Sequence, residues 1–367
     1  MKLFTKEMIR PLYYGSLFNA CGGGEYSDHL PLIVERFIEE NGPVSCISLD
    51  DFPENGTALT AGIMGSMLES SLQTGKEGVQ VVSRLCEQLD ITYDAIFTIE
   101  ASSLNVLFPI LIAGLLKTPI IDGDCMGRAF PEFQMTTAEA IGEKIAPMSI
   151  VTPKGEYYYF DDLENLLFEV QAREIVSHEN GLAYFAGFPL DARRLRSVML
   201  PKTLSFAYEI GSCFMEASSY GRLLEEIIEV TKNSIYGSAI ELFVGTVSTI
   251  EPAHDGGRNW TNFSMEGVGS YQNSRFSILT QNEALIAFRD DQIAAMVPDL
   301  ITLIDLRTLR PLSCSSLHEQ MKVAVLGIPA PVRLKSPAML TVLGPACFGY
   351  NQEYVPLEKI YSHWYFG

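Results

Sequence analysis

The sequence has few positive charges and few histidines, and each shortage excludes a class of function. Only 26 Lys and Arg residues stand against 45 Asp and Glu residues, which gives a formal net charge of −19. Such a surface repels phosphate groups, so we expect no binding to nucleic acid or to a membrane surface. The five histidines are far apart and none has HxH, HxxxH or HExxH spacing. A histidine-rich zinc site is therefore not expected.

Paired cysteines, long apolar runs and the common nucleotide motifs are also absent. The seven cysteines include no CxxC pair, and their odd number argues against a disulfide framework, so we expect a cytoplasmic location. The N-terminus lacks the features of a signal peptide. The longest strongly apolar run, 104–116, is shorter than the roughly 20 residues of a membrane-spanning helix. No GxGxxG, GxxxxGK[ST] or GxSxG motif occurs, so neither a nucleotide site nor a hydrolase nucleophile elbow has support.

What is present is enough apolar material for two domains. The chain has 367 residues, 47 % of them hydrophobic, and a domain takes roughly 150 residues. In the first part of the chain, helix and strand patterns alternate, which predicts a largely parallel sheet flanked by helices. The expected helices span 28–40, 78–89 and 105–116, and the expected strands span 44–49, 95–99 and 118–122.

The rest of the chain follows another pattern. Helices are expected over 162–177, 191–216 with a break near Pro201, and 220–232. Short segments rich in β-branched and aromatic residues follow, at 240–250, 274–279, 283–288, 292–297, 300–304, 323–328 and 339–343. They predict a β-rich domain of the barrel or sandwich kind, with a helical lead-in. The predicted domains are residues 1–160 and 161–367.

Three consecutive glycines, Gly22, Gly23 and Gly24, precede the helix-capping residues Ser27 and Asp28. Glycine lets a backbone approach a ligand closely, and the N–H groups of a helix N-terminus attract anions. The alternative is a tight turn that binds nothing. The sequence alone leaves both interpretations open.

The most informative segment spans residues 122–132, DGDCMGRAFPE, directly after a predicted strand. Open α/β sheets bind ligands at the carboxyl ends of their strands. Asp122, Asp124 and Glu132 bring three carboxylates to one loop with the Arg128 guanidinium. Neighbouring carboxylates raise one another's pKa and an arginine lowers it, so one of them is a candidate acid or base. The same oxygens suit a hard divalent metal ion. The alternative is a loop held together by Asp–Arg hydrogen bonds.

Two further candidates lie after the predicted strand 95–99. Glu100 ends this strand and Asn105 opens the next helix. If strands 95–99 and 118–122 are neighbours, Glu100 faces the same crevice as Asp122. The alternative is that this segment only caps the helix, at Ser103.

Together these motifs resemble one family. The glycines 22–24, the segment from Glu100 to Asn105 and the stretch 122–135 are joined by QNE at 281–283, PDLI at 298–301, and GP at 344–345 with FGY at 348–350. Their order and spacing resemble the S-methyl thiohydantoin desulfurase family over nearly the whole chain. Its members are often described beside hydantoinase and oxoprolinase proteins. The resemblance implies an N-terminal α/β domain and a C-terminal, mostly β domain.

The resemblance also implies a reaction, the hydrolysis of a cyclic S-methyl thiohydantoin to a hydantoin with loss of methanethiol. In this interpretation Asp122 or Asp124 is the base, with a possible divalent metal but no certain cofactor. Arg128 orients the loop or binds an anionic substituent, Glu132 and Glu100 tune the site, and Asn105 lies beside the substrate. The amides of Gly22–Gly24 contact the ring carbonyl.

A second hypothesis needs no catalysis by this chain. The protein would be a ligand-binding or regulatory partner of a hydantoinase-like enzyme, which would account for the missing nucleophile elbow and histidine cluster. Direct hydrolysis of hydantoin or oxoproline is a weaker third hypothesis, because the usual metal ligands and nucleotide loop are not found. The expected ligand is a small cyclic amide or thiohydantoin in each case, and a homo-oligomer is expected as a possibility.

Overall fold

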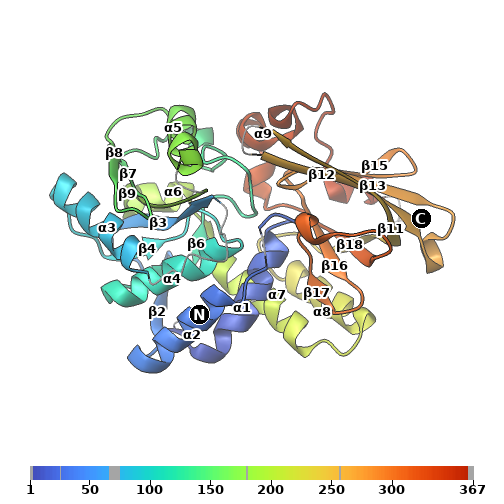
Figure 1. The fold of residues 1–367 in the computed structure, drawn as a ribbon, viewed down its shortest axis with the longest axis horizontal. Coiled ribbons are helices and arrows are strands. Elements are labelled where there is room, and N and C mark those ends of the chain that lie inside the picture. Colours follow the sequence, from blue (N-terminus) through green and yellow to red (C-terminus); the bar gives the residue numbers. More distant parts are fainter. Residues whose placement is uncertain (1–2, 25, 66–74, 179–180, 256–257, 363–367) are drawn as a thin grey trace. The chain divides into compact units, whose positions relative to one another are not determined.

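The computed structural model describes residues 3–24, 26–65, 75–178, 181–255 and 258–362. It consists of two compact units, each assembled from separate stretches of chain (Figure 1). The N-terminal unit comprises Met1–Tyr13, Ser27–Met126 and Glu132–Ser205. The C-terminal unit comprises Tyr14–Tyr26, Gly127–Pro131 and Phe206–Gly367. Compact units that interleave in this way are not defined by one cut, and the predicted domain division at residues 160–161 stays a prediction.

The N-terminal unit contains a mixed sheet with the strand order β1-β2-β5-β4-β3-β9-β7-β8. Its strands are β1 (Leu3–Phe4), β2 (Val44–Ile47), β3 (Thr57–Gly65), β4 (Ala95–Phe97), β5 (Ile120–Ile121), β7 (Met148–Val151), β8 (Tyr157–Phe160) and β9 (Leu182–Asp191). Only β2, β5, β4 and β3 run parallel to one another, and the other joins are antiparallel. The expectation of a largely parallel sheet is therefore corrected to a partly parallel one. Strand β9 escaped prediction because it is buried along nearly its whole length and shows no alternation.

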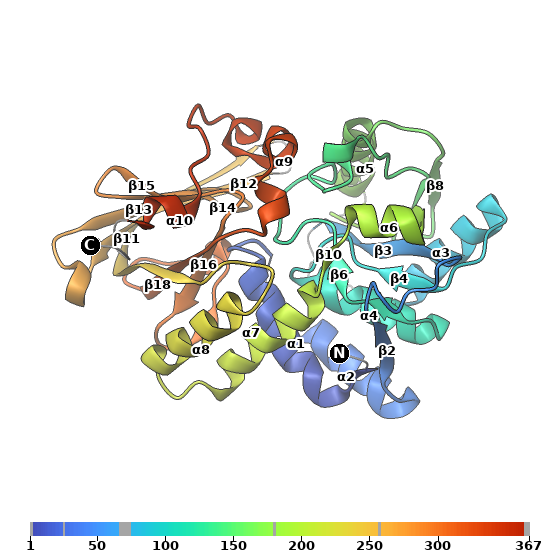
Figure 2. The ribbon, with the colours of Figure 1, turned by 180° about the vertical axis from the view of Figure 1, so that it is seen from behind.

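Helices cover both faces of this sheet (Figures 1 and 2). Phe108 of α4 (Leu104–Leu116) packs on Tyr184 of β9. The next residue of β9, Phe185, belongs to the apolar cluster that contains Phe168 of α5 (Asn165–His178). Successive side chains of a strand point to opposite faces, so α4 and α5 lie on opposite sides. α3 (Lys76–Leu89) accompanies α4, and α6 (Ala192–Val198) accompanies α5. α4 is the helix of the longest apolar run, and it is buried over most of its length.

The C-terminal unit contains an antiparallel sheet with the order β15-β14-β13-β12-β11-β18-β16-β17. Its strands are β11 (Ile240–Asp255), β12 (Arg258–Gly267), β13 (Arg275–Gln281), β14 (Glu283–Arg289), β15 (Gln292–Met296), β16 (Leu300–Asp305), β17 (Arg310–Pro311) and β18 (Lys322–Ile328). The predicted β-rich character is confirmed. Among the described strands, β15 and β17 are the two edges of the sheet and do not pair with each other, so the expected barrel is corrected to one open sheet.

The predicted helical lead-in is present as α7 (Thr203–Glu216) and α8 (Tyr220–Lys232). Their apolar side chains form one buried cluster with side chains of the antiparallel sheet. Phe206 of α7, Ile227 of α8 and Leu326 of β18 belong to this cluster. The short strand β10 (Leu200–Pro201) separates α6 from α7 near the predicted break at Pro201, and it pairs with β6 (Gly123–Asp124). The remaining helices are α1 (Lys6–Asn19), α2 (His29–Asn41), α9 (Pro337–Leu343) and α10 (Leu357–Ile360).

One predicted strand is wrong. Residues 339–343 belong to helix α9, which begins at Pro337. The hydroxyl of Ser336 accepts a hydrogen bond from the Met339 amide at 3.3 Å, and proline is favoured in a first helical turn. The local capping signal decides this segment over its β-branched composition.

Candidate functional site

The acidic segment and the Glu100 segment lie side by side in the N-terminal unit. β4 and β5 pair in parallel through Ile96 and Ile120, which confirms that the two predicted strands are neighbours. Beyond the strands, Asp124 Oδ2 accepts a hydrogen bond from the Ala101 amide at 2.8 Å. The Cys125 amide donates to the Ile99 carbonyl at 3.0 Å. The segments that follow β4 and β5 are thus joined directly at the carboxyl ends of two parallel strands.

Asp122 is buried and holds the start of α7. Its Oδ1 accepts from the Ser205 amide at 2.9 Å, and its Oδ2 accepts from the Ser205 hydroxyl. Its carbonyl accepts from the Lys202 amide at 2.9 Å. First-turn amides of a helix have no partner within the helix, so Asp122 acts as a capping carboxylate supplied from a distant part of the chain.

Asp124 is fully buried, and its backbone belongs to the β6–β10 pair, opposite Leu200. A carboxylate placed there is costly unless it is hydrogen-bonded, and the Ala101 amide is one donor that satisfies it. The side chain therefore has a fixed orientation at the carboxyl end of β5.

The two glutamates of the predicted site are half-buried, and each accepts a hydrogen bond from a side chain two positions later in the sequence. Glu100 accepts a hydrogen bond from the Ser102 hydroxyl through Oε1. Glu132 accepts from Gln134 Nε2 at 2.5 Å through Oε2. Partial exposure leaves both carboxylates less desolvated than Asp124.

The side-chain amide of Asn105 is hydrogen-bonded to the backbone of β3. Its Oδ1 accepts from the Ile63 amide at 2.9 Å, and its Nδ2 donates to the Ile63 carbonyl at 3.1 Å. β3 extends beyond the end of β4, and the Asn105 side chain takes the place of a neighbouring strand at Ile63. Its geometry is that of a residue that positions the start of α4.

The predicted site segment divides between the two units. Residues 122–126 and Glu132 belong to the N-terminal unit, whereas Gly127–Pro131 belongs to the C-terminal unit. There the Arg128 side chain is fully buried and donates to the carbonyls of Asp299 at 2.8 Å, Ala284 at 2.9 Å and Ala129 at 3.1 Å. The guanidinium thus fastens its loop to the backbone of the C-terminal unit.

The three glycines also belong to the C-terminal unit. Gly22 has φ 83°, and its carbonyl accepts from the Cys314 amide at 2.8 Å. A Cβ atom at Gly22 would lie 2.5 Å from Cys314 Sγ, and one at Gly23 would lie 2.6 Å from Glu283 Oε1. The Gly23 amide donates to the Ala20 carbonyl at 2.8 Å. Gly22 and Gly23 therefore allow a close approach to Cys314 and Glu283, while Gly24 is exposed.

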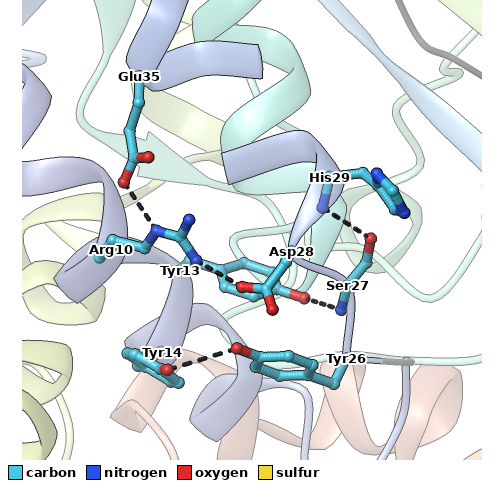
Figure 3. A network of polar contacts seen from close by, with 8 residues as sticks. All are labelled: Arg10, Tyr13, Tyr14, Tyr26, Ser27, Asp28, His29 and Glu35. Carbon is cyan, nitrogen blue, oxygen red and sulfur yellow. Dashed lines mark hydrogen bonds and ion pairs between the residues drawn. The ribbon is translucent and has the colours of Figure 1, made fainter. Parts of the chain in front are cut away.

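The chain after the glycines is fixed in the N-terminal unit by polar contacts (Figure 3). Arg10 of α1 donates to Glu35 of α2 at 2.8 Å and to Asp28 at 2.5 Å. The Ser27 amide donates to the Tyr13 hydroxyl at 2.7 Å. Asp28 occupies the N-cap position of α2, but its side chain makes no capping bond and pairs with Arg10. Asp28, which was expected to cap α2 through its side chain, instead links α2 to Arg10 of α1. Within the C-terminal unit, Tyr14 and Tyr26 stack with ring centroids 6.4 Å apart.

Sequence analysis singled out Asp299 only as part of the PDLI motif at 298–301 and missed its role as a buried anchor. Its Oδ1 accepts from the Ala330 amide at 2.7 Å, and its Oδ2 accepts from the Leu357 amide at 2.8 Å. The Tyr354 hydroxyl lies 3.0 Å from both oxygens. Burial raises the pKa of Asp299 to about 6. The residues next to it in the sequence give no sign of these partners, which lie 31 and 58 positions further along the chain.

Two properties concern metals and membranes. Within the described ranges, no three His, Cys, Asp or Glu side chains come together as a set that could hold a metal ion. No helix in the described part of the chain is long and apolar enough to cross a membrane.

The fold is that of a two-unit protein with a mixed α/β unit and an antiparallel β unit. Comparisons with known proteins identify the family to which it belongs. Models of the S-Me-THD-like N-terminal and C-terminal domains match residues 7–162 and 164–357. The chain belongs to this family, the one that its sequence motifs resemble. The crystal structure of a Chromobacterium violaceum protein, solved by the Northeast Structural Genomics Consortium, is similar, with a TM-score of 0.80 and 20 % identity over 97 % of this chain and 100 % of that one. That similarity establishes the fold. No curated protein sequence matches the chain.

Proposed function

We propose that this protein hydrolyses a small cyclic heterocycle of the S-methyl thiohydantoin class. The observation that carries the proposal is the pair of loops at the carboxyl ends of β4 and β5, joined by the Asp124–Ala101 hydrogen bond. This is where open α/β sheets bind ligands. Membership of the S-Me-THD-like family supports the substrate class.

In the proposed reaction, Asp124 is the base. It takes a proton from water, which attacks the ring carbon that carries the S-methyl group. The carbon–sulfur bond then breaks and the sulfur leaves with that proton as methanethiol. The second proton of the water goes to the ring nitrogen, and the product is the hydantoin. The sequence left a divalent metal ion open as a possibility, and an assay with and without an added divalent metal tests whether one takes part.

The other predicted residues take supporting roles. Asp122 positions the start of α7, because both of its oxygens accept from Ser205. Arg128 anchors its loop through three backbone carbonyls. Glu100 and Glu132 adjust the charge near the base. A contact between the glycine amides and the ring carbonyl is not part of the proposal, since the Gly23 amide is bonded to Ala20.

One observation favours the second hypothesis, a ligand-binding partner without catalysis. Asp122 and Asp124 both accept hydrogen bonds that hold backbone segments in place, as expected of structural carboxylates. The protein would then bind the ring and leave it unchanged. Such a subunit would associate with a hydantoinase-like enzyme.

The test is incubation of the purified protein with S-methylated thiohydantoins and with plain hydantoins, followed by mass spectrometry of methanethiol and ring products. We expect methanethiol release that falls by about 10²–10⁴-fold in Asp124→Asn, the usual contribution of a positioned base. Asp305→Asn, a buried aspartate of the C-terminal unit, is the matched control. Full activity of Asp124→Asn would sink the assignment of the base. Ring binding without turnover in the unaltered protein would favour the partner hypothesis.

A further inference from the structure

A cavity of about 430 Å³ lies on the antiparallel sheet of the C-terminal unit, away from the candidate site of the N-terminal unit. Its walls come from the adjacent strands β12, β13 and β14 and from the turn that leads to β15 (Figure 2). The volume is within the range of small-molecule sites. Six side chains line this one space: Ser264, Arg275, Ser277, Phe288, Asp290 and Asp291.

The strand register places three of the lining side chains in one row across the sheet. Ser264 of β12 is the partner of Ser277 of β13, and Ser277 is the partner of Phe288 of β14. Cross-strand partners point to the same face of a sheet. The neighbouring residues Met265 and Phe276 point to the other face, where they belong to the buried core. The row therefore presents two hydroxyls and one half-exposed aromatic ring to the cavity.

Arg275 brings a positive charge to this row. Its register partner on β12 is Glu266, yet in the part of the chain that the structure describes Arg275 forms no ion pair. The guanidinium instead turns toward the row, where Nη2 donates a long hydrogen bond of 3.4 Å to the Ser264 hydroxyl. A guanidinium has five N–H donors in a planar fork, which matches the two oxygens of a carboxylate. The Arg275 side of the cavity therefore suits a carboxylate.

Two negative charges reach the cavity from the turn between β14 and β15. Asp290 and Asp291 occupy the two central positions of this turn, with φ 49° and 64°. Asp290 Oδ1 accepts from the Arg275 amide at 2.8 Å, and this bond together with the Ser274 hydroxyl lowers the pKa of Asp290. The side chain of Asp291 forms no hydrogen bond or ion pair with another described residue. This side of the cavity therefore suits an ammonium group.

We propose that the cavity binds a small zwitterion of the amino-acid class with an apolar side chain. The ligand carboxylate pairs with Arg275 and accepts from the two serine hydroxyls, the ammonium group pairs with the aspartates of the turn, and the apolar side chain packs on Phe288. A purely anionic ligand would be repelled by the two aspartates, and a purely cationic one would leave Arg275 without a partner. The inference concerns the C-terminal unit and does not depend on the proposed hydrolysis.

The first test compares four probes with the full-length protein, with ligand-observed NMR titrations as the measurement. L-Phenylalanine carries all three groups, 3-phenylpropanoate lacks the ammonium group, phenethylamine lacks the carboxylate, and glycine lacks the apolar side chain. We expect L-phenylalanine to bind with a Kd on the order of 1 mM, as suits a small ligand in an open site. Each of the other probes should bind about tenfold more weakly, the effect of one lost charged or apolar contact.

Two variants assign the charges to particular residues. Arg275→Gln should weaken L-phenylalanine and 3-phenylpropanoate about tenfold and leave phenethylamine unchanged, whereas Asp291→Asn should weaken L-phenylalanine and phenethylamine and not 3-phenylpropanoate. Asparagine adopts the left-handed conformation readily, so Asp291→Asn keeps the turn. The matched controls are Arg222→Gln on the exposed surface of α8 and Asp90→Asn, an exposed aspartate with φ 52°. Both should bind all four probes as the unaltered protein does.

Three outcomes would overturn the inference. One is equal binding of L-phenylalanine and the three probes that lack a group. Another is unchanged binding of L-phenylalanine by both Arg275→Gln and Asp291→Asn. The last is an unaltered protein that does not bind L-phenylalanine up to the solubility limit of the amino acid. None of these outcomes affects the proposed hydrolysis, which the turnover of Asp124→Asn tests separately.

Discussion

Asp124 accepts a hydrogen bond from the backbone amide of Ala101 at 2.8 Å, and this bond joins the segments that follow two neighbouring parallel strands. The role of base that we propose for Asp124 can be separated from this structural role. The proposed base needs the charge of the carboxylate, whereas the Ala101 amide needs only an oxygen that accepts its hydrogen bond.

This separation gives a prediction for stability. Asp124→Asn keeps an acceptor for the Ala101 amide, so its free energy of unfolding should stay close to that of the unaltered protein. Asp124→Ala leaves a buried N–H without a partner, which should cost about 1–3 kcal/mol. Urea unfolding of the two variants measures the difference. Equal stabilities of the Asn and Ala variants would contradict the structural part of the role.

A parallel arrangement of the strands β4 and β5 could be predicted from sequence. The hydrogen-bond partners of the residues between 122 and 132 could not. Two short apolar strands on either side of an apolar helix predict a parallel pair, and their loops then share one edge. The partners of Arg128, in contrast, lie 156 and 171 positions further along the chain, at Ala284 and Asp299. No local pattern indicates which distant backbone a guanidinium will meet.

The same limit explains the glycines and Asn105. A run of glycines indicates close approach, but whether to a ligand or to the chain itself depends on what lies opposite, here Cys314 and Glu283. Asn105 looked available for a substrate because β3 was not predicted, and so its partner Ile63 was missing from the reasoning. Unrecognised strands therefore account for this part of the difference between the predicted and observed environments.

Asp122 and Ser205 should be energetically coupled. The Asp122 carboxylate accepts from both the amide and the hydroxyl of Ser205, 83 positions apart in sequence. Loss of such a cap typically costs about 0.5–2 kcal/mol. We expect Asp122→Ala and Ser205→Ala to be non-additive in a double-mutant cycle, because each removes the hydroxyl–carboxylate bond. Strictly additive losses in thermal or urea unfolding would argue against this contact.

Arg128 should matter for the stability of the C-terminal unit. Lysine has no planar fork, so Arg128→Lys cannot reproduce the bonds to the carbonyls of Asp299 and Ala284. Two buried carbonyls without partners would lower the free energy of unfolding by roughly 3 kcal/mol. Arg222→Lys, on the exposed surface of α8, is the control. The assignment fails if Arg128→Lys unfolds at the same urea concentration as that control.

The raised pKa of Asp299 predicts that the free energy of unfolding depends on pH. Burial raises its pKa from the ordinary aspartate value of 3.8 to about 6 in the folded protein, although the Ala330 and Leu357 amides oppose the shift. The folded state therefore binds the proton more tightly than the unfolded state does. This contribution to stability is complete below about pH 4, is lost as the pH rises through about 6, and amounts to about 3 kcal/mol at most.

Asp299→Asn should remove this part of the pH dependence. The comparison is the change in the free energy of unfolding between about pH 4 and about pH 7 within each variant, since the absolute stability of the Asn variant also reflects its altered hydrogen bonds. We expect a smaller fall for Asp299→Asn than for the unaltered protein. Asp305→Asn controls for the loss of a buried aspartate as such. An identical fall in all three proteins would contradict the assignment.

The protein should be more stable with glycine in place of Ser103. Ser103 joins the end of the β4 segment to α4 with φ 45° and ψ −130°, a backbone conformation that residues with a side chain disfavour. Ser103→Gly should therefore raise the free energy of unfolding by about 1 kcal/mol. Ser102→Gly is the matched control: its φ is not in the left-handed region, and it loses the bond to Glu100. It should be destabilised, so a stabilised Ser102→Gly or a destabilised Ser103→Gly would show that backbone strain does not govern this turn.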